Sequence, residues 1–92
     1  MEFRSLPGGD LIELGLADLA AGRESVEALL VAIGGPRLRA LGIEVPALEA
    51  PEHRLYELLA SADSDAAHSR YNALLRRLVS FERAAECASH RT

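Results

Sequence analysis

The chain has 92 residues and a formal net charge of −4, and 49% of its residues are hydrophobic. This composition excludes a disordered chain and argues against a surface that binds nucleic acid non-specifically. Because there are only two Phe, two Tyr and no Trp, the core must consist mainly of Leu and Ala, which are strong helix formers.

Residues 1–9 are predicted to be extended, because a Pro-Gly-Gly sequence interrupts regular structure. Asp10 is expected to be the N-cap of a first helix, with Glu13 three residues later in the capping-box position. Gly22 is expected to end this helix.

A second helix is predicted to begin after Ser25, which can cap it, and to end at Gly34-Gly35. Its residues are apolar on nearly all sides, so we expect it to be buried or to lie at an interface. Pro36 is predicted to begin a short third helix, which Gly42 ends.

Residues 43–51 contain two prolines and are predicted to form an extended connector. Pro51 begins a fourth helix that runs to about Ala60. The side chains expected to point inward from it are Leu55, Tyr56, Leu58 and Leu59. A turn at 61–65 leads to a last helix from about Asp65 to Ala88, which spans about 36 Å.

Such a helix is about three times as long as the radius of gyration of a compact domain of this size, about 12 Å. The last helix must therefore cross the whole molecule or project from it. The predicted fold is all-α: a small bundle of four or five helices with a long C-terminal helix, in a single helical domain over residues 1–92.

The last helix carries the residues that we expect to mediate interactions. On a helical wheel, one apolar stripe contains Tyr71, Leu74, Leu75, Leu78 and Ala85. Glu82 falls inside this stripe, and no arginine of the same helix is placed to pair with it. A buried carboxylate needs a donor or takes up a proton.

Three surroundings of Glu82 are considered. It can reach water at the edge of the stripe. It can pair with an arginine from elsewhere in the chain, namely Arg23, Arg37, Arg39 or Arg54. It can also meet the Tyr71 hydroxyl of a second copy, because two antiparallel helices would bring these residues together.

Charge is unevenly distributed, since residues 1–65 carry a net −7 and residues 66–92 a net +3. Arg76 and Arg83 lie opposite the apolar stripe, and Arg70 and Arg77 flank it. A basic segment on an acidic chain can dock on that chain, on a second copy or on an acidic partner.

From these features we expect a non-enzymatic interaction protein. It would form a homo-oligomer or bind a partner protein through apolar helix faces, as a small acidic antitoxin-like subunit does. The alternative is a nucleic-acid-associated module that uses the four arginines of the last helix. Phosphate contacts by Arg37 and Arg39, in a segment similar to a helix-turn-helix, are also considered.

The pair Arg83 and His90 resembles the Arg-x6-His spacing of HEPN-type ribonucleases, although Ala84 replaces the polar residue usual after that arginine. The resemblance covers two residues and implies a helical ribonuclease. Cys87 and His90 could supply two metal ligands, but no second pair accompanies them. We therefore expect no enzyme activity, metal or cofactor, and no small-molecule substrate.

The location of the protein is predicted from three features. Cys87 is the single cysteine, so no disulfide can form within the chain. The first nine residues lack the apolar run of a signal peptide. The longest uncharged run, residues 28–36, is too short to cross a membrane. A cytoplasmic protein without membrane contact is expected.

Overall fold

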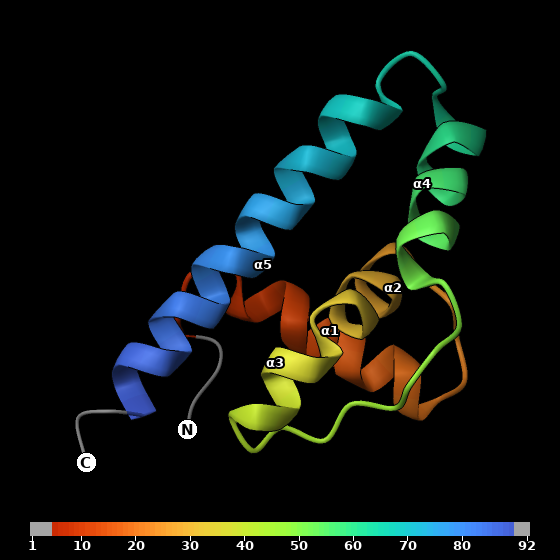
Figure 1. Cartoon of the computed structure of the whole chain (residues 1–92). Coiled ribbons are helices and arrows are strands. Elements are labelled where there is room, and N and C mark those ends of the chain that lie inside the picture. Colours follow the sequence, from red (N-terminus) through yellow and green to blue (C-terminus); the bar gives the residue numbers. More distant parts are fainter. Residues whose placement is uncertain (1–4, 90–92) are drawn as a thin grey trace.

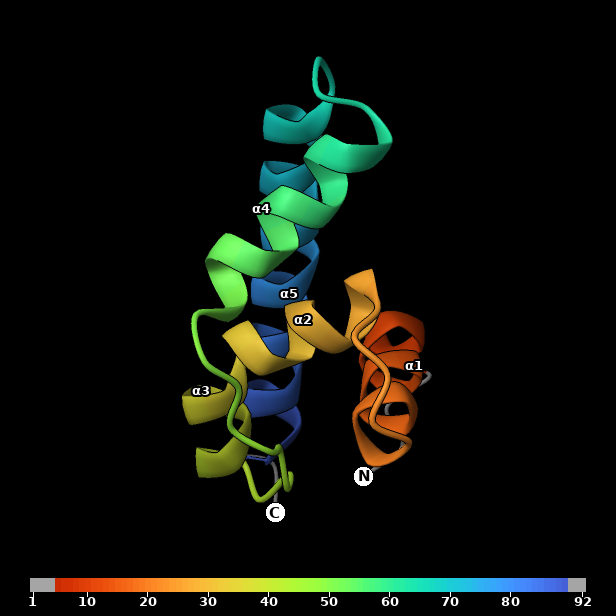
Figure 2. The same cartoon turned by 90° about the vertical axis from the view of Figure 1, so that its right-hand side faces the viewer.

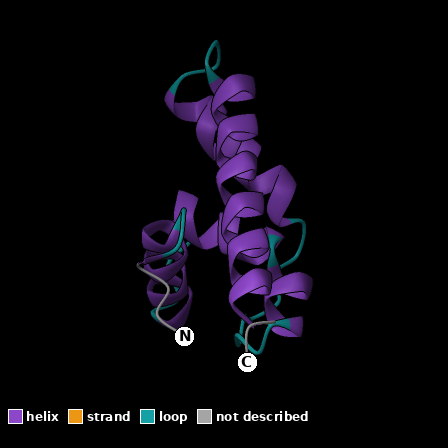
Figure 3. Cartoon of the chain, turned by 90° about the vertical axis from the view of Figure 1, so that its left-hand side faces the viewer, coloured by secondary structure: helices purple, strands orange, loops and turns teal. Residues whose placement is uncertain are grey.

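The computed structural model describes residues 5–89. This range contains five helices and no strand, which confirms the predicted all-α fold with a long C-terminal helix (Figure 3). The helices are α1 (Gly9–Ala20), α2 (Val26–Ile33), α3 (Gly35–Ala40), α4 (Pro51–Ala62) and α5 (Ala67–Ser89).

The longest helix, α5, runs along the length of the molecule (Figure 1). Its 23 residues span about 34 Å, and the molecule measures 44 × 25 × 19 Å along its principal axes. The antiparallel helix α4 lies beside the first half of α5, and α1, α2 and α3 gather around its second half (Figure 2). The first half of α5 thus belongs to a two-helix arm that projects from the other helices.

The central helix is α2, which contacts the four other helices. Its residues 28–32 are all buried, as its apolar sequence predicts. It packs most closely on α1 at Gly15, where a Cβ atom would lie 2.4 Å from the Glu27 carbonyl oxygen and from Val31 Cγ2. The buried core contains Ile12, Leu29, Leu30, Val31, Leu38, Ile43, Val45, Leu55, Leu59, Ala67, Leu78, Phe81 and Ala85.

Local signals correctly placed the turn between α1 and α2. Gly22 adopts a positive φ of 76° just after α1, and the Arg23 amide donates to the Asp18 carbonyl at 2.8 Å. These features form a Schellman motif that ends the helix. Ser25 caps α2 as predicted, since its Oγ accepts a hydrogen bond from the Ala28 amide at 3.1 Å.

The predicted start of α1 is wrong. Gly8, not Asp10, occupies the N-cap position, and no side chain caps the helix. Because Gly8 adopts a φ of 73°, its carbonyl can accept hydrogen bonds from Leu11 and Ile12, and the helix begins at Gly9. Residues 5–8 form turns, whereas an extended segment was expected; residues 1–4 lie outside the description.

The segment from α3 to α5 differs in detail from the prediction. The short helix α3 begins at Gly35, one residue before Pro36, and residues 43–50 form neither helix nor strand before α4 begins at Pro51. The last helix begins at Ala67, not at Asp65. The Asp63 carboxylate accepts hydrogen bonds from the amides of Asp65 and Ala66, so these residues form a turn before α5.

Two side chains of α4 do not point inward as expected. Leu55 and Leu59 are buried, but Tyr56 and Leu58 are 39% and 37% exposed. The neighbouring helices α2 and α5 cover the strip of α4 that contains Leu55 and Leu59. The flanks of α4 therefore remain open to solvent.

Candidate functional site

The apolar stripe of α5 faces the other helices, as the helical wheel predicts. Leu78 is buried, and Tyr71, Leu74 and Leu75 are half-buried against the core. This side of α5 therefore packs against the other helices. The role of the half-buried residues in binding another protein stays a prediction.

Glu82 is buried within this stripe, with 6% of its side chain exposed. Its Oε1 atom lies 3.7 Å from Nη1 of Arg37 on α3, which is an ion pair too long for a hydrogen bond. A Cβ on Gly34 would lie 3.0 Å from Glu82 Oε2, so this glycine leaves room for the carboxylate. Of the three predicted surroundings, the structure shows the ion pair within the chain.

Arg37 is shared between two carboxylates of α5. Its Nε donates to Glu86 Oε1 at 2.6 Å, and this hydrogen bond raises the pKa of Arg37. Burial raises the pKa of Glu82 above 4.5, the nearby Glu86 raises it further, and Arg37 opposes the shift. The cost of burying the Glu82 charge therefore exceeds the attraction of its distant partner.

Tyr71 packs against its own chain. Its ring lies edge-to-face on Tyr56 with the centroids 5.8 Å apart, which joins α4 to α5. Burial, and secondly the charge of Glu52, raise the pKa of Tyr71. Since Glu82 is enclosed beside Arg37, the geometry gives no support to the predicted contact between Tyr71 and Glu82 of a second copy.

The four arginines of α5 lie on its solvent side. Arg70, Arg76, Arg77 and Arg83 are all exposed. Arg77 approaches Asp10 of α1, with Nη2 3.4 Å from Oδ1. The other three form no ion pair with any residue in the described range 5–89. Within that range, no acid neutralises their charge.

The two arginines of α3 that were considered for phosphate contacts are engaged inside the chain. Arg37 binds Glu86, and Arg39 donates through Nη1 to the Val45 carbonyl at 2.7 Å. These bonds tie α3 to α5 and to the connector. They give α3 a structural role and lower its value as a DNA-reading helix.

The possible metal ligands lie apart. His53 pairs with Glu57 on the surface of α4, and His68 contacts Asn72 on α5. Among the described residues, no group of three or more His, Cys, Asp or Glu side chains could hold a metal ion. His90 lies outside the described range, and with it the predicted pairs formed with Arg83 and Cys87.

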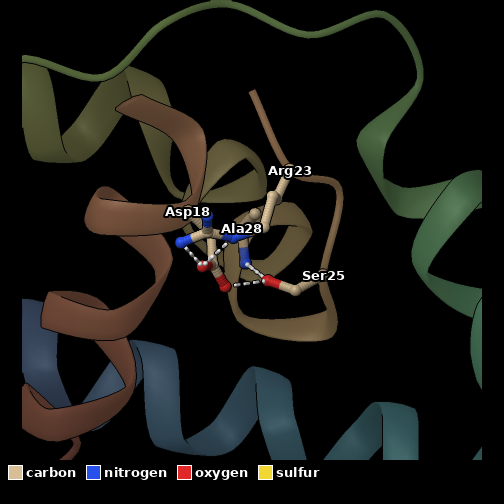
Figure 4. Close-up of polar contacts among 4 residues, drawn as sticks. All are labelled: Asp18, Arg23, Ser25 and Ala28. Atoms are coloured by element: carbon tan, nitrogen blue, oxygen red, sulfur yellow. Dashed lines mark hydrogen bonds and ion pairs between the residues drawn. The ribbon is translucent and has the colours of Figure 1, made fainter. Parts of the chain in front are cut away.

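A polar cluster that sequence analysis missed joins α1 to α2 (Figure 4). The Ser25 hydroxyl donates to Asp18 Oδ2 at 2.5 Å, and Arg23 Nε donates to Asp18 Oδ1 at 3.0 Å. The hydrogen bond from Ser25 is the main cause that lowers the pKa of Asp18, and the hydrogen bond from Arg23 lowers it further. The cluster fixes the turn, and the predicted N-cap at Ser25 was the one signal for it.

An open groove of about 950 Å³ separates α1 from the connector. It is lined by Leu16, Ala20, Arg39, Gly42, Ile43, Glu44, Val45 and Pro46. Apolar side chains dominate it, and the guanidinium of Arg39 is already bonded to the Val45 carbonyl. The groove therefore offers an apolar surface with one free charge, Glu44.

A scan against protein-family models and searches of the curated proteins and of the solved structures found no match to this chain. Within residues 5–89, none of the helices combines the length and the apolar character needed to span a membrane.

Proposed function

We propose that the chain is a non-enzymatic protein-interaction module that associates with a second copy, or with a partner protein, through the apolar side chains of α4 and α5. The observation that carries this proposal is their exposure. Four large hydrophobic side chains are exposed in the described residues, and three of them, Tyr56, Leu58 and Val79, belong to these two helices.

The arrangement of the helices supports the same proposal. Helices α2 and α5 cover only the strip of α4 that contains Leu55 and Leu59, and its flanks with Tyr56 and Leu58 stay exposed. Tyr71, Leu74 and Leu75 are half-buried. Removing such side chains from water contributes about 25 cal/mol of favourable free energy per Å² of apolar area. Burial of these side chains against another helical surface would therefore favour binding.

Sedimentation equilibrium near micromolar concentration tests this proposal. The wild-type chain is expected to form a dimer or larger species, and Leu58→Ser and Val79→Ser are expected to weaken it. Leu14→Ser is the matched control, because Leu14 is 56% exposed on α1, away from the arm. A 9.9 kDa monomer would exclude self-association. A monomer that also captures no protein in an arm-dependent manner would contradict the proposal.

The alternative function is binding to nucleic acid, and the exposure of Arg70, Arg76, Arg77 and Arg83 favours it. The net charge of −4 opposes it, because the acidic remainder of the chain repels phosphates. Salt-sensitive retention on oligonucleotides that is lost in Arg76→Gln would support this alternative.

A further inference from the structure

The solvent side of α5 is a positively charged face on which Asp10 of α1 meets Arg77, and Arg70, Arg76 and Arg83 form no ion pair within residues 5–89. Arg70, Arg76, Arg77 and Arg83 are exposed along about 20 Å of helix. The acidic residues of α5, Glu82 and Glu86, turn to the opposite side and meet Arg37 on α3. The excess positive charge of this face, three arginines beyond the Arg77–Asp10 pair, is complementary to an acidic partner.

The arginines form two rows along the helix. Arg76 and Arg83 are seven residues apart, as are Arg70 and Arg77, so within each row the two side chains project in nearly the same direction, about 10.5 Å apart along the axis. The two rows are about 100° apart around the helix. Between them lies a lane of small exposed side chains with the same spacing, Ala73, Ser80 and Cys87.

We propose that this face of α5 binds an acidic helix of a partner protein, with Asp or Glu side chains repeated every seven residues on both sides of the contact. The arginine rows would pair with those carboxylates, as charged flanking positions do between paired helices. The small side chains between the rows would let the two backbones approach closely. The face borders Val79 on α5 but does not include Tyr56 and Leu58 of α4, two of the exposed apolar side chains that carry the proposed function.

The arrangement favours a helix over a nucleic acid. Binding of single strands uses aromatic side chains on which bases stack, but the aromatic residues of α5, Tyr71 and Phe81, lie on its inner side. The seven-residue spacing matches another helix, which repeats its contacts every two turns. A symmetric contact between two α5 faces is disfavoured, because it would place arginines against arginines.

The probe is a synthetic helical peptide with Glu on both flanks of an Ala-rich contact ridge, labelled for fluorescence anisotropy. The wild-type chain is expected to bind it, and to bind the same peptide with Gln in place of Glu much more weakly. Arg76→Gln and Arg83→Gln should each weaken binding about two- to five-fold, the range for exposed ion pairs. Arg54→Gln, a matched charge loss on α4, should leave binding unchanged.

Ser80→Trp separates helix docking from simple charge attraction, because it fills the lane and keeps every arginine. We expect it to weaken peptide binding at least tenfold while circular dichroism shows an unchanged helical spectrum. Equal binding by Ser80→Trp and wild type would overturn the proposal, as would tighter binding to a single-stranded oligonucleotide than to the Glu peptide. The proposed function has its own test in the sedimentation of Leu58→Ser on α4, which leaves this face of α5 intact.

Discussion

Replacing Glu82 tests how the chain tolerates a buried carboxylate. Its nearest cation, Arg37, is 3.7 Å away and already donates to Glu86 at 2.6 Å. Removing Glu82 therefore does not leave Arg37 without a partner, and the loss of 3–5 kcal/mol that follows from breaking a well-made buried pair does not apply. Glu82→Ala mainly loses the packing of one methylene, about 0.8 kcal/mol, and leaves a space beside Gly34.

We expect Glu82→Ala to lower the free energy of unfolding by about 1–2 kcal/mol at pH 7. Glu82→Gln keeps the shape and removes the buried charge, so we expect it to be neutral or slightly stabilising. Urea denaturation with unchanged m-values measures both differences. A loss of more than about 2 kcal/mol in Glu82→Gln would refute this reasoning, because it would show that the charge has a strong partner.

The pH dependence gives a second check on the same residue. Because burial raises the pKa of Glu82 in the folded chain above 4.5, the folded state binds more protons than the unfolded state between these two pKa values. The contribution of Glu82 to the stability of the folded chain is thus greatest below pH 4.5, and it falls as the pH rises through the raised pKa. Wild type should gain stability relative to Glu82→Gln on acidification from pH 7, and equal profiles would contradict the shift.

Three further predictions concern the packing of α1 on α2. Gly15→Ala should lower the free energy of unfolding by about 3 kcal/mol, because the added Cβ meets the Glu27 carbonyl; a loss below about 1 kcal/mol in urea denaturation would show that the helices can separate. Ser25→Ala should cost about 1 kcal/mol through loss of the N-cap, and an unchanged urea midpoint would contradict this. Because folding lowers the pKa of Asp18, its ionised carboxylate stabilises the folded chain above pH 3.8. This contribution to stability is lost as the pH falls through the lowered pKa. Thermal melts at several pH values should show that acid destabilises wild type more than Asp18→Asn, and parallel curves would exclude a role for the cluster.

Short-range signals in the sequence predicted the parts of the fold that depend on a few adjacent residues. Ser25 and Gly22 were placed correctly because capping and a left-handed turn are local properties. Asp10 was misplaced because the sequence offered two competing starts, and the positive φ of Gly8 favoured the earlier one. Such a choice depends on how the preceding turn packs.

Contacts between segments that are distant in the sequence determined the features that sequence analysis could not predict, namely the partner of Glu82 and the burial of two aromatic side chains. The wheel placed Glu82 in the inward stripe, but its partner Arg37 lies 45 residues earlier and could be named only as one of four arginines. Phe81 lies at the border of the same stripe and was not singled out, yet it is fully buried. Tyr56 seemed equally suited to the core, but it lies at the edge of the contact between α4 and α5, where its ring meets Tyr71 and stays 39% exposed.

The most direct test of association through α4 and α5 is a series of amide NMR spectra recorded as the wild-type chain is diluted through micromolar concentrations. The proposed function predicts that signals near Tyr56, Leu58 and Val79 shift with concentration while those near Leu14 on α1 stay fixed. Shifts confined to α1, or spectra that are identical at every concentration, would contradict self-association through α4 and α5.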